Sequence, residues 1–506
     1  MMNITEFLWH QSVLIFNFID EHAVGFVIIA ALCIIVWMGV HDLIQTKHTI
    51  KRNFPVIGFL RYALEFIGPE LRQYLLHDER SDRPIPRYIR TWIYAHSKGQ
   101  LGTVAFGTKK DLDKPGTILV RHSHFPVNPS HEESHYDHRV VIGARRRYPY
   151  EASIFNISAM SYGALGKNAV LALSHGAHQG GFYHNTGEGG ASRYHFEGGA
   201  DLVMQIGTGK FGVRNSDGSF SEEKFLDLAR RPQLKMFEIK LSQGAKPGKG
   251  GVLPKEKITD EIAEIRGVPK NQDVISPPRH VDWDDNVGML KWIDNLQNKG
   301  GKPIGIKFCL GRKEYVYDLI QAIKDTGMMP DFITVDGAEG ATGAAPLAHT
   351  DYLGYPLKDA LMFVDNALRE AGLRESIRLI ASGKVFTGAD LAIILALGAD
   401  LAQSARGFML SIGCIHALKC NTNHCPAGIA THDSWLQRGL VVEEKSPRVA
   451  NYHSAVIYEF NSVLHSCGYK YPQELKRSDV MKVIDYNKIV TMDELIPQPP
   501  LKACVE

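Results

Sequence analysis

Short apolar segments alternate with helix-like segments between residues 151 and 406. Most of the apolar segments are continuous or rich in β-branched residues, and they lack the regular alternation of a strand that faces solvent on one side. Such runs are typical of strands buried on both faces of a parallel sheet. The expected strands cover 153–159, 182–186, 202–207, 236–241, 303–309, 332–337, 377–382 and 401–406.

Helical patterns fall between several of these strands, for example in EYVYDLIQAIKDTG and GADLAIILALGAD. Repeated strand–helix alternation predicts a parallel sheet, and eight strands over about 250 residues are typical of a TIM (β/α)8 barrel. A doubly wound sheet would need a nucleotide fingerprint at a strand–helix turn. Gly207, Gly209 and Gly212 match G-x-G-x-x-G, but a turn-like segment follows where a helix is required. We therefore interpret this stretch as a glycine-rich barrel loop.

A second pattern lies near the N-terminus. Residues 23–40, AVGFVIIAALCIIVWMGV, carry no charge and are long enough to span a bilayer. No Lys or Arg precedes Lys47, whereas Lys51 and Arg52 follow it closely, so the positive-inside rule places the rest of the chain in the cytoplasm. The expected location is the inner (cytoplasmic) membrane, crossed once; a buried core helix is the alternative. Residues 54–76 either lie on the membrane or pack on the soluble part.

These patterns divide the chain into four parts and complete the fold class. It is α/β, a TIM barrel with an N-terminal transmembrane helix and a helical C-terminal tail. The expected domains are a membrane anchor (1–46), a linker that wraps the barrel (47–150), the barrel (151–440) and a helical extension (441–506).

Composition narrows the function classes. The 57 basic and 55 acidic residues nearly balance, and no basic run or nucleic-acid motif occurs, so no nucleic-acid partner is expected. Four of the seven cysteines are isolated along the chain. This usage is unlike a disulfide framework and indicates a reducing compartment.

Glycine-rich, polar segments follow most of the predicted strands. They include MSYGALG, NTGEGG, SQGAKPGKGG, GAEGATGAAP, SGKVFTGAD and ARGFM. In a barrel these segments share one end, where phosphate is often held after the last two strands. Backbone N–H groups around Gly383, Lys384 and Gly407 are suited to that role. Together the segments indicate a phosphate-bearing cofactor.

Three cysteines, Cys414, Cys420 and Cys425, follow the last strand with C-x5-C-x4-C spacing. Three close thiols suit a three-iron, four-sulfur cluster or a cluster with one open corner. Zinc held by three Cys and either His416 or His424 is a second interpretation. Three unrelated packing cysteines are the third.

At these residues the chain resembles the FMN and iron–sulfur synthase domain of glutamate synthase, over roughly 100–435. The resemblance is carried, in order, by ISAMSYGALG, NTGEGG, KLSQGAKPGKGGVLP, ISPPRH, VDGAEGATGAAP, ASGKVFTGAD and GCIHALKCNTNHCPAGIATHD. It implies a TIM barrel that binds FMN, with the three cysteines holding a 3Fe-4S cluster beside the flavin.

The resemblance also implies roles for individual residues. Glu188 and Lys240 are the expected catalytic residues, at the ammonia-entry side and near the flavin. The expected substrate contacts are Lys246, Arg266, Gly340 and Thr342, and two cations suit a dicarboxylate. Without the resemblance, Arg266 in EIAEIRG would be interpreted as part of a solvated helix face. The expected FMN contacts are Ser158, Ala159, Met160, Lys240, Gln243, Gly383, Lys384, Arg406 and Gly407.

The chain departs from the family pattern at several points. The amidotransferase domain, which begins with a catalytic cysteine, is replaced here by the predicted membrane helix, so glutamine hydrolysis is not expected. Val252 stands where the family has a glutamine, Asn421 where it has a histidine, and Glu339 where it has an aspartate. Val252 puts the identity of the substrate in question.

The expected function is reductive amination of 2-oxoglutarate with ammonia to L-glutamate by a membrane-tethered FMN and iron–sulfur oxidoreductase. A ferredoxin or a separate reductase subunit would supply electrons, and ammonia would be free or come from a partner subunit. One alternative keeps the cofactors and changes the 2-oxo acid or amine, as in N-methylglutamate formation. Another is a non-catalytic, membrane-anchored electron relay.

Overall fold

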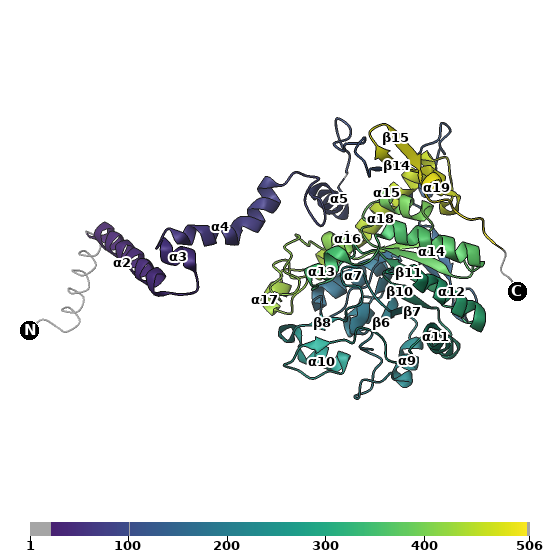
Figure 1. Ribbon diagram of the computed structural model, residues 1–506, viewed down its shortest axis with the longest axis horizontal. Helices are drawn as coiled ribbons and strands as arrows, with labels where there is room; N and C mark the ends of the chain where they lie inside the picture. The colour runs from purple at the N-terminus through teal and green to yellow at the C-terminus, as the bar shows by residue number, and fades with distance from the viewer. Residues whose placement is uncertain (1–21, 101, 503–506) are drawn as a thin grey trace, which may run out of the picture. The chain divides into compact units, whose positions relative to one another are not determined.

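The computed structural model describes residues 22–100 and 102–502 (Figure 1). The chain divides into two compact units, Met1–Arg87 and Tyr88–Glu506. The first unit contains α2 (Ala23–Ile44), α3 (Thr49–Asn53), α4 (Gly58–Leu71) and a π-helical turn, η1 (Arg72–Leu76). Each unit is described by itself.

Helix α2 carries the apolar segment that the sequence analysis expects to span a membrane. Within the described part of the chain, Val24–Ile44 is the single helix long and apolar enough to cross a bilayer, and none of its most apolar window is buried. The expected span of 23–40 ends four residues before the helix does, at Ile44. Length and composition alone qualify this helix, as they would a signal sequence.

The turn after α2 is fixed by side-chain hydrogen bonds. Asp42 Oδ2 accepts from the Val56 backbone N–H at 3.0 Å, and Gln45 bonds the backbone of His48 in both directions. Helix α4 then places Phe59, Leu60 and Leu64 in exposed positions. The hydrogen bonds fix the turn between α2 and α4. The exposed apolar side chains of α4 do not decide between its two expected locations, on the membrane or against the soluble part.

The second unit is built around a closed barrel of eight parallel strands. In spatial order the strands are β10-β11-β12-β13-β4-β5-β6-β7. Their bounds are β4 (Phe155–Ile157), β5 (Tyr183–Asn185), β6 (Asp201–Ile206), β7 (Leu234–Lys240), β10 (Ile304–Phe308), β11 (Phe332–Asp336), β12 (Arg378–Ser382) and β13 (Leu401–Ser404). Every expected strand coincides with one barrel strand to within two residues at either end, so the TIM-barrel prediction is confirmed.

Helices surround the barrel, as its strand–helix alternation requires (Figure 1). The longer ones are α7 (Lys167–Gly180), α9 (Glu222–Ala229), α11 (Asn286–Gly300), α12 (Glu314–Thr326), α14 (Leu357–Ala371), α15 (Gly388–Ala396) and α18 (Val442–Ser466). The short ones are α5 (Arg87–Ser97), α6 (His131–His135), α8 (Arg193–Glu197), α10 (Asp260–Arg266), α13 (Leu347–Tyr352), α16 (Arg406–Ser411), α17 (Ser434–Gln437) and α19 (Met492–Leu495). Single 3-10 turns are η2 (Gly187–Gly189), η3 (Lys255–Lys257), η4 (Pro472–Glu474) and η5 (Arg477–Asp479).

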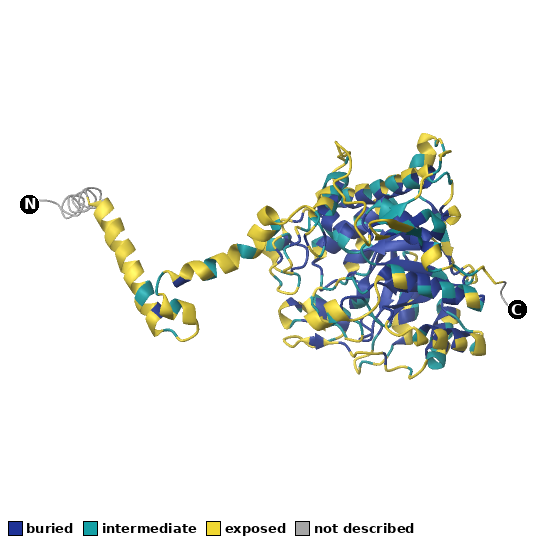
Figure 2. Ribbon diagram, turned by 45° about the horizontal axis from the view of Figure 1, so that its top comes forward, coloured by how far each residue is buried: buried dark blue, intermediate teal, exposed yellow. Residues whose placement is uncertain are grey.

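The barrel strands are dark in Figure 2 because their side chains are buried. A hairpin of β2 (Arg139–Ile142) and β3 (Tyr150–Ser153) precedes the first barrel strand. Its apolar side chains join those of the barrel in one core cluster, formed by Ile142, Tyr150, Ala152, Tyr183, Val203, Met236, Phe332, Ile380 and Leu401. Apolar side chains thus fill the end of the barrel next to this hairpin. Farther along the strands the interior is polar, where the buried Glu238 carboxylate accepts from Asn185, Gln205 and Thr334.

The C-terminal tail contains α18, which confirms the expected helical extension, and it also contains strands. Strand β1 (Ile118–Val120) pairs with β14 (Val480–Asp485), which pairs with β15 (Lys488–Thr491). A further two-stranded hairpin, β8 (Val252–Leu253) with β9 (Val274–Ile275), lies between β7 and β10. The sequence analysis expected none of these strands.

A buried carboxylate ties the tail to the barrel layer. Asp365 of α14 is fully buried and accepts hydrogen bonds from Arg369, Arg374 and Arg477 at 2.8–2.9 Å. Gln498 donates a fourth bond at 2.8 Å. Buried charges are stable only when they are paired and hydrogen-bonded, and this carboxylate meets that requirement with partners from several segments.

We expect Asp365→Ala to lower the free energy of unfolding by about 3–5 kcal/mol, because it leaves buried guanidinium groups without their anion. The measurement is urea-induced unfolding followed by circular dichroism. Glu370→Ala is the control: Glu370 is an exposed acid on the same helix, and its loss should change stability by no more than about 0.5 kcal/mol. Equal effects of the two substitutions would contradict a structural role for the Asp365 cluster.

Candidate functional site

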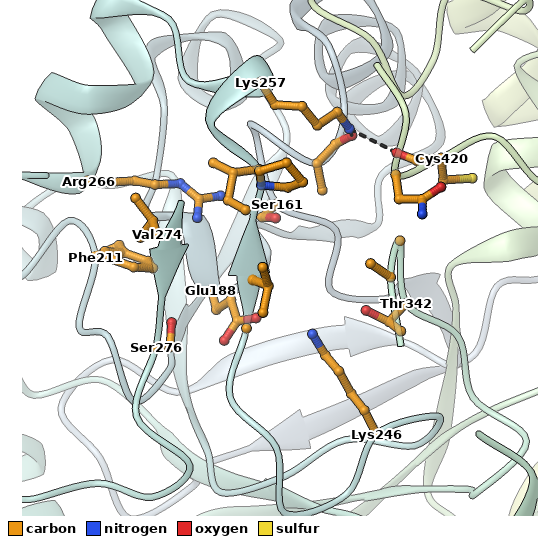
Figure 3. Close-up of a pocket in the computed structure, with 18 residues that line it drawn as sticks. Ser161, Glu188, Phe211, Lys246, Lys257, Arg266, Val274, Ser276, Thr342 and Cys420 are labelled. Carbon is orange, nitrogen blue, oxygen red and sulfur yellow. Dashed lines mark hydrogen bonds between the residues drawn. The ribbon is translucent and has the colours of Figure 1, made fainter. Parts of the chain in front are cut away.

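A pocket opens at the C-terminal ends of the barrel strands (Figure 3). Its walls come from the segments after β4, β5, β6, β7 and β11, from the β8–β9 hairpin with α10, and from the cysteine loop. The side chains that carry charge into it are Glu188, Lys246, Lys257 and Arg266. In TIM barrels this end of the strands carries the chemistry.

Glu188 and Lys240 form an ion pair across the barrel end. Glu188 lies on η2, directly after β5, and Lys240 is the last residue of β7. Their Oε1 and Nζ atoms are 3.0 Å apart. Gly207 and Gly251 flank the carboxylate so closely that a Cβ on either would lie 2.7–2.8 Å from its oxygens. Glycine at both positions therefore leaves the space that the carboxylate occupies.

The charge of Glu188 is set by opposing effects. Burial raises the pKa of its carboxyl group, but the cations of Lys240, Lys246 and Arg266 outweigh burial and hold the pKa below its ordinary value of 4.5. The Lys246 ammonium in turn has a lowered pKa, first because of burial and despite the attraction of Glu188. At neutral pH the pocket therefore presents one carboxylate among several cations.

Arg266 points inward from α10. It is only 4% exposed, its Nη2 donates to the Tyr162 carbonyl oxygen at 3.0 Å, and its guanidinium lies 4.9 Å from the centre of the Phe211 ring. Gly163 and Gly189 allow this approach, since a Cβ on either would lie 2.9 Å from Nη2. Burial lowers the pKa of Arg266 to about 10, so it stays charged. The interpretation of a solvated face, drawn from EIAEIRG alone, is wrong.

The segment after β11 supplies Thr342 to the pocket wall. Gly340 lies behind it, against the backbone of Gly244. Glu339 does not line the pocket: its carboxylate accepts from the Leu357 backbone N–H at 3.1 Å, at the start of α14, and its carbonyl oxygen accepts from Arg406 Nη2 at 2.6 Å. The Asp-to-Glu departure at this position thus has a structural role.

The expected flavin contacts gather at the ends of β4, β7, β12 and β13. Ser158 Oγ and Ser382 Oγ are 3.2 Å apart, and Met160 is buried. Ala159, Gln243, Gly383 and Lys384 are half-buried at strand ends. A Cβ on Gly383 would meet Leu357, and one on Gly407 would meet the Tyr452 hydroxyl, so helix packing alone accounts for both glycines.

Further polar groups there were not anticipated from the sequence. Lys307 of β10 is the register partner of Lys240 on β7, is buried, and lies 3.7 Å from Asp336. Gln403 is buried at the end of β13, and its Nε2 finds no partner within the described part of the chain. Lysine and amide donors at this position suit the carbonyl edge of a flavin ring, so the residues present fit FMN.

The three cysteines converge on one place. Burial is the largest cause that raises the pKa of Cys414 to about 12, and Cys420 and Cys425 act in the same direction; burial and then Cys425 raise the pKa of Cys420. His416, Leu418 and Asn423 adopt left-handed backbone conformations, which let the loop wrap tightly. Among residues 22–100 and 102–502 no group of three His, Cys, Asp or Glu side chains is spaced to hold a single metal ion. Three convergent thiols match in number the protein ligands that a three-iron cluster needs.

Comparison with known proteins identifies the family. The conserved region in glutamate synthase matches residues 120–470. This chain belongs to the glutamate synthase family.

Curated relatives agree with this assignment. The glutamate synthase large subunit-like protein YerD of Bacillus subtilis (strain 168) is 40% identical over 91% of this chain and 95% of its own length. The archaeal glutamate synthase [NADPH] of Methanocaldococcus jannaschii is 35% identical over 62% of this chain, which spans 58% of that protein. Among solved structures, the recombinant flavin-binding domain of baker's yeast flavocytochrome b2 aligns with 77% of this chain and 83% of its own, at 15% identity and a TM-score of 0.44.

Membership makes the chain a glutamate synthase-like oxidoreductase and supports FMN as its cofactor. The structure brings Glu188, Lys246, Arg266, Thr342 and Cys420 to one pocket. Val252 and Asn421, two of the departures from the family pattern, also line it. The expected flavin contacts, Lys240 among them, lie outside the pocket wall, as do Gly340, Cys414 and Cys425.

The sequence analysis gave no role to several pocket residues, among them Phe211, Lys257 and Ser276. Phe211 lies inside the G-x-G-x-x-G segment, in which the glycines are the recognisable pattern. Lys257 belongs to KEK, which reads as a solvated charged turn. No local signal separates Lys257 from a surface position, because only the packing of the long segment between β7 and β10, which also holds Ser276, turns it inward.

We expect Glu188→Gln to lower the free energy of unfolding by about 1–3 kcal/mol at pH 7, because it leaves buried cations without their anion. The contribution of a carboxylate with a depressed folded-state pKa is present above its unfolded pKa, here 4.5, and is lost as the pH falls through the folded value. The difference between wild type and variant should therefore shrink below that pH.

The measurement is urea-induced unfolding between pH 3.5 and 7 at matched cofactor content. Glu197→Gln removes an exposed carboxylate of α8 and serves as the control, with little effect at any pH. A difference between wild type and Glu188→Gln that grows as the pH falls would contradict the assigned charge of Glu188.

Proposed function

We propose that this chain is an FMN and iron–sulfur oxidoreductase that converts 2-oxoglutarate and ammonia to L-glutamate. The observation that carries the proposal is the convergence of Arg266, Lys246 and Glu188, which is paired with Lys240, on one pocket at the end of a barrel. A dicarboxylate needs two cationic contacts, and imine reduction needs a proton donor beside them. The pocket offers both.

The cationic contacts suit the two carboxylates of an oxo acid. Arg266 offers a planar guanidinium that can bind a carboxylate through two N–H groups, whereas Lys246 offers a single ammonium. The Lys246 amine points into the pocket from the segment after β7 (Figure 3). Burial of both cations excludes water from them and strengthens their attraction for an anion.

Glu188 and Lys240 are placed to handle protons. The carbonyl carbon loses water when ammonia condenses with it, and the resulting imine takes up a hydride and a proton. Bound FMN would supply the hydride, and Lys240, Lys307 and Gln403 would hold its ring. Glu188 Oε1, 3.0 Å from Lys240 Nζ, would accept a proton from the ammonium group formed when ammonia adds to the carbonyl carbon, and would return one through Lys240.

Cys414, Cys420 and Cys425 would hold the 3Fe-4S cluster and receive electrons from a separate ferredoxin or reductase subunit. Ammonia would be free or delivered by a partner subunit. The cluster assignment rests on the closeness of the thiols and on the family resemblance of the loop.

Val252 favours a second substrate. It lines the pocket and is 40% exposed there, where the family has a polar glutamine. An apolar side chain suits a substrate methyl group, as when methylamine replaces ammonia and the product is N-methylglutamate. The two proposals are distinguished by measuring whether methylamine supports turnover as well as ammonia does.

The test is an absorption spectrum with flavin and iron analysis on detergent-purified protein, followed by titration with 2-oxoglutarate. We expect flavin bands, about three irons per chain and a spectral shift on binding. Arg266→Met and Lys246→Met should each weaken binding about 10–100-fold, since each removes a charged hydrogen bond.

Lys249→Met is the matched control, because Lys249 is an exposed lysine of the same segment outside the pocket wall. Protein that contains flavin and iron but shows no spectral shift would contradict 2-oxoglutarate as the substrate. That result would be consistent with an electron relay. Protein without iron would contradict the cluster.

We propose further that α2 tethers the protein to the cytoplasmic membrane. The support is its length and composition together with Lys47, Lys51 and Arg52 after it. After an alkaline carbonate wash, the full chain should stay with the membrane pellet, and a variant that lacks residues 23–44 should be released. Release of the full chain, or retention of the truncated one, would contradict the tether.

A further inference from the structure

Lys257 physically joins the pocket to the cysteine loop. It lies on η3, just after β8, and is only 2% exposed. Its Nζ donates to the Ala164 carbonyl oxygen at 2.9 Å and to the Cys420 carbonyl oxygen at 3.0 Å. Figure 3 shows the ammonium reaching across the pocket wall to Cys420. Three segments that are distant in sequence meet at this one amine.

Burial disfavours the charged form of the Lys257 amine, so the charge needs neighbouring groups that stabilise it. The pKa of Lys257 is lowered to about 8: burial is the largest cause and Arg266 acts in the same direction, whereas the sulfurs of Cys420 and Cys425 act against it. An unpaired buried ammonium is strongly unfavourable. The two carbonyl oxygens and the nearby sulfurs are the groups that compensate.

We propose that Lys257 is a positioning residue for electron transfer: it holds the cysteine loop against the segment after β4 and supplies the positive charge that sets the reduction potential of the group on the three cysteines. The inference rests on the proposed iron–sulfur cluster. Lys257 has no part in the proposed substrate chemistry, and the spacing of the cysteines does not point to it.

Two physical consequences follow from the geometry. The carbonyl contacts fix Cys420 relative to Ala164, in the segment after β4 that also carries expected flavin contacts, so they set the separation between the two redox groups. A cluster that gains an electron becomes more negative, and a nearby cation in a site of low dielectric favours that reduced state. Loss of the cation should therefore make the potential more negative.

The test is a redox titration of the cluster, followed by electron paramagnetic resonance, on the iron-loaded full chain. In Lys257→Met we expect the reduced state to be disfavoured by about tenfold, which corresponds to a shift of about 59 mV for one electron. Lys257→Arg keeps the charge and both donors and should restore a potential near that of wild type. Lys255→Met removes an exposed lysine of the same turn and should leave the potential unchanged.

Lys257→Gln separates the two roles, because an amide can still donate to the carbonyl oxygens without carrying charge. It should bind iron as wild type does and show the lowered potential. Loss of iron in Lys257→Met, with flavin retained and with Lys257→Gln and Lys257→Arg loaded, would also support the role in holding the loop.

An iron-loaded Lys257→Met or Lys257→Gln with the potential of wild type would overturn the proposal. Equal shifts in Lys257→Met and Lys255→Met would overturn it as well, since they would show an effect of net charge alone. Wild type that binds no iron would instead contradict the proposed cluster, so failure of that assignment is distinguishable from failure of the role of Lys257.

Discussion

The arrangement of the pocket depends on the Glu188 carboxylate, because it is surrounded by cations that would otherwise repel one another. Lys240 lies 3.0 Å from it, and Lys246 and Arg266 both lower its pKa. Like charges in a site of reduced dielectric cost several kcal/mol when no anion separates them. The glycines at 207 and 251 are part of the same constraint, since any side chain there would occupy the space of the carboxylate.

This constraint explains why a barrel end can hold so much positive charge. The strands place Lys240 and Lys307 side by side, and each has its own acid, Glu188 or Asp336. Arg266 lies under the Phe211 ring and against two glycines. These contacts hold the cations in place before a substrate binds. A substrate dianion would therefore bind with little reorganisation of the protein.

The sequence was sufficient for the barrel and insufficient for the pocket, for different physical reasons. Strands buried on both faces leave a continuous apolar signal, and all eight barrel strands were predicted from it. The two-residue strands β8 and β9 are too short to show any period. Arg266 and Lys257 lie on short, charged segments that resemble solvated turns, and only tertiary packing turns them inward. The resemblance to the family could place Arg266 but gave no reason to single out Lys257.

The pocket residues come from two kinds of segment, the ends of barrel strands and the long segment between β7 and β10. Glu188 follows β5 directly and Lys240 ends β7, so the sheet fixes their geometry. Val252, Lys257 and Arg266 come from the segment between β7 and β10, outside the regular strand–helix alternation. A segment that is not part of the barrel can change without disturbing the strands. Differences in substrate within the family should therefore be sought in that segment, where Val252 already departs from the family pattern.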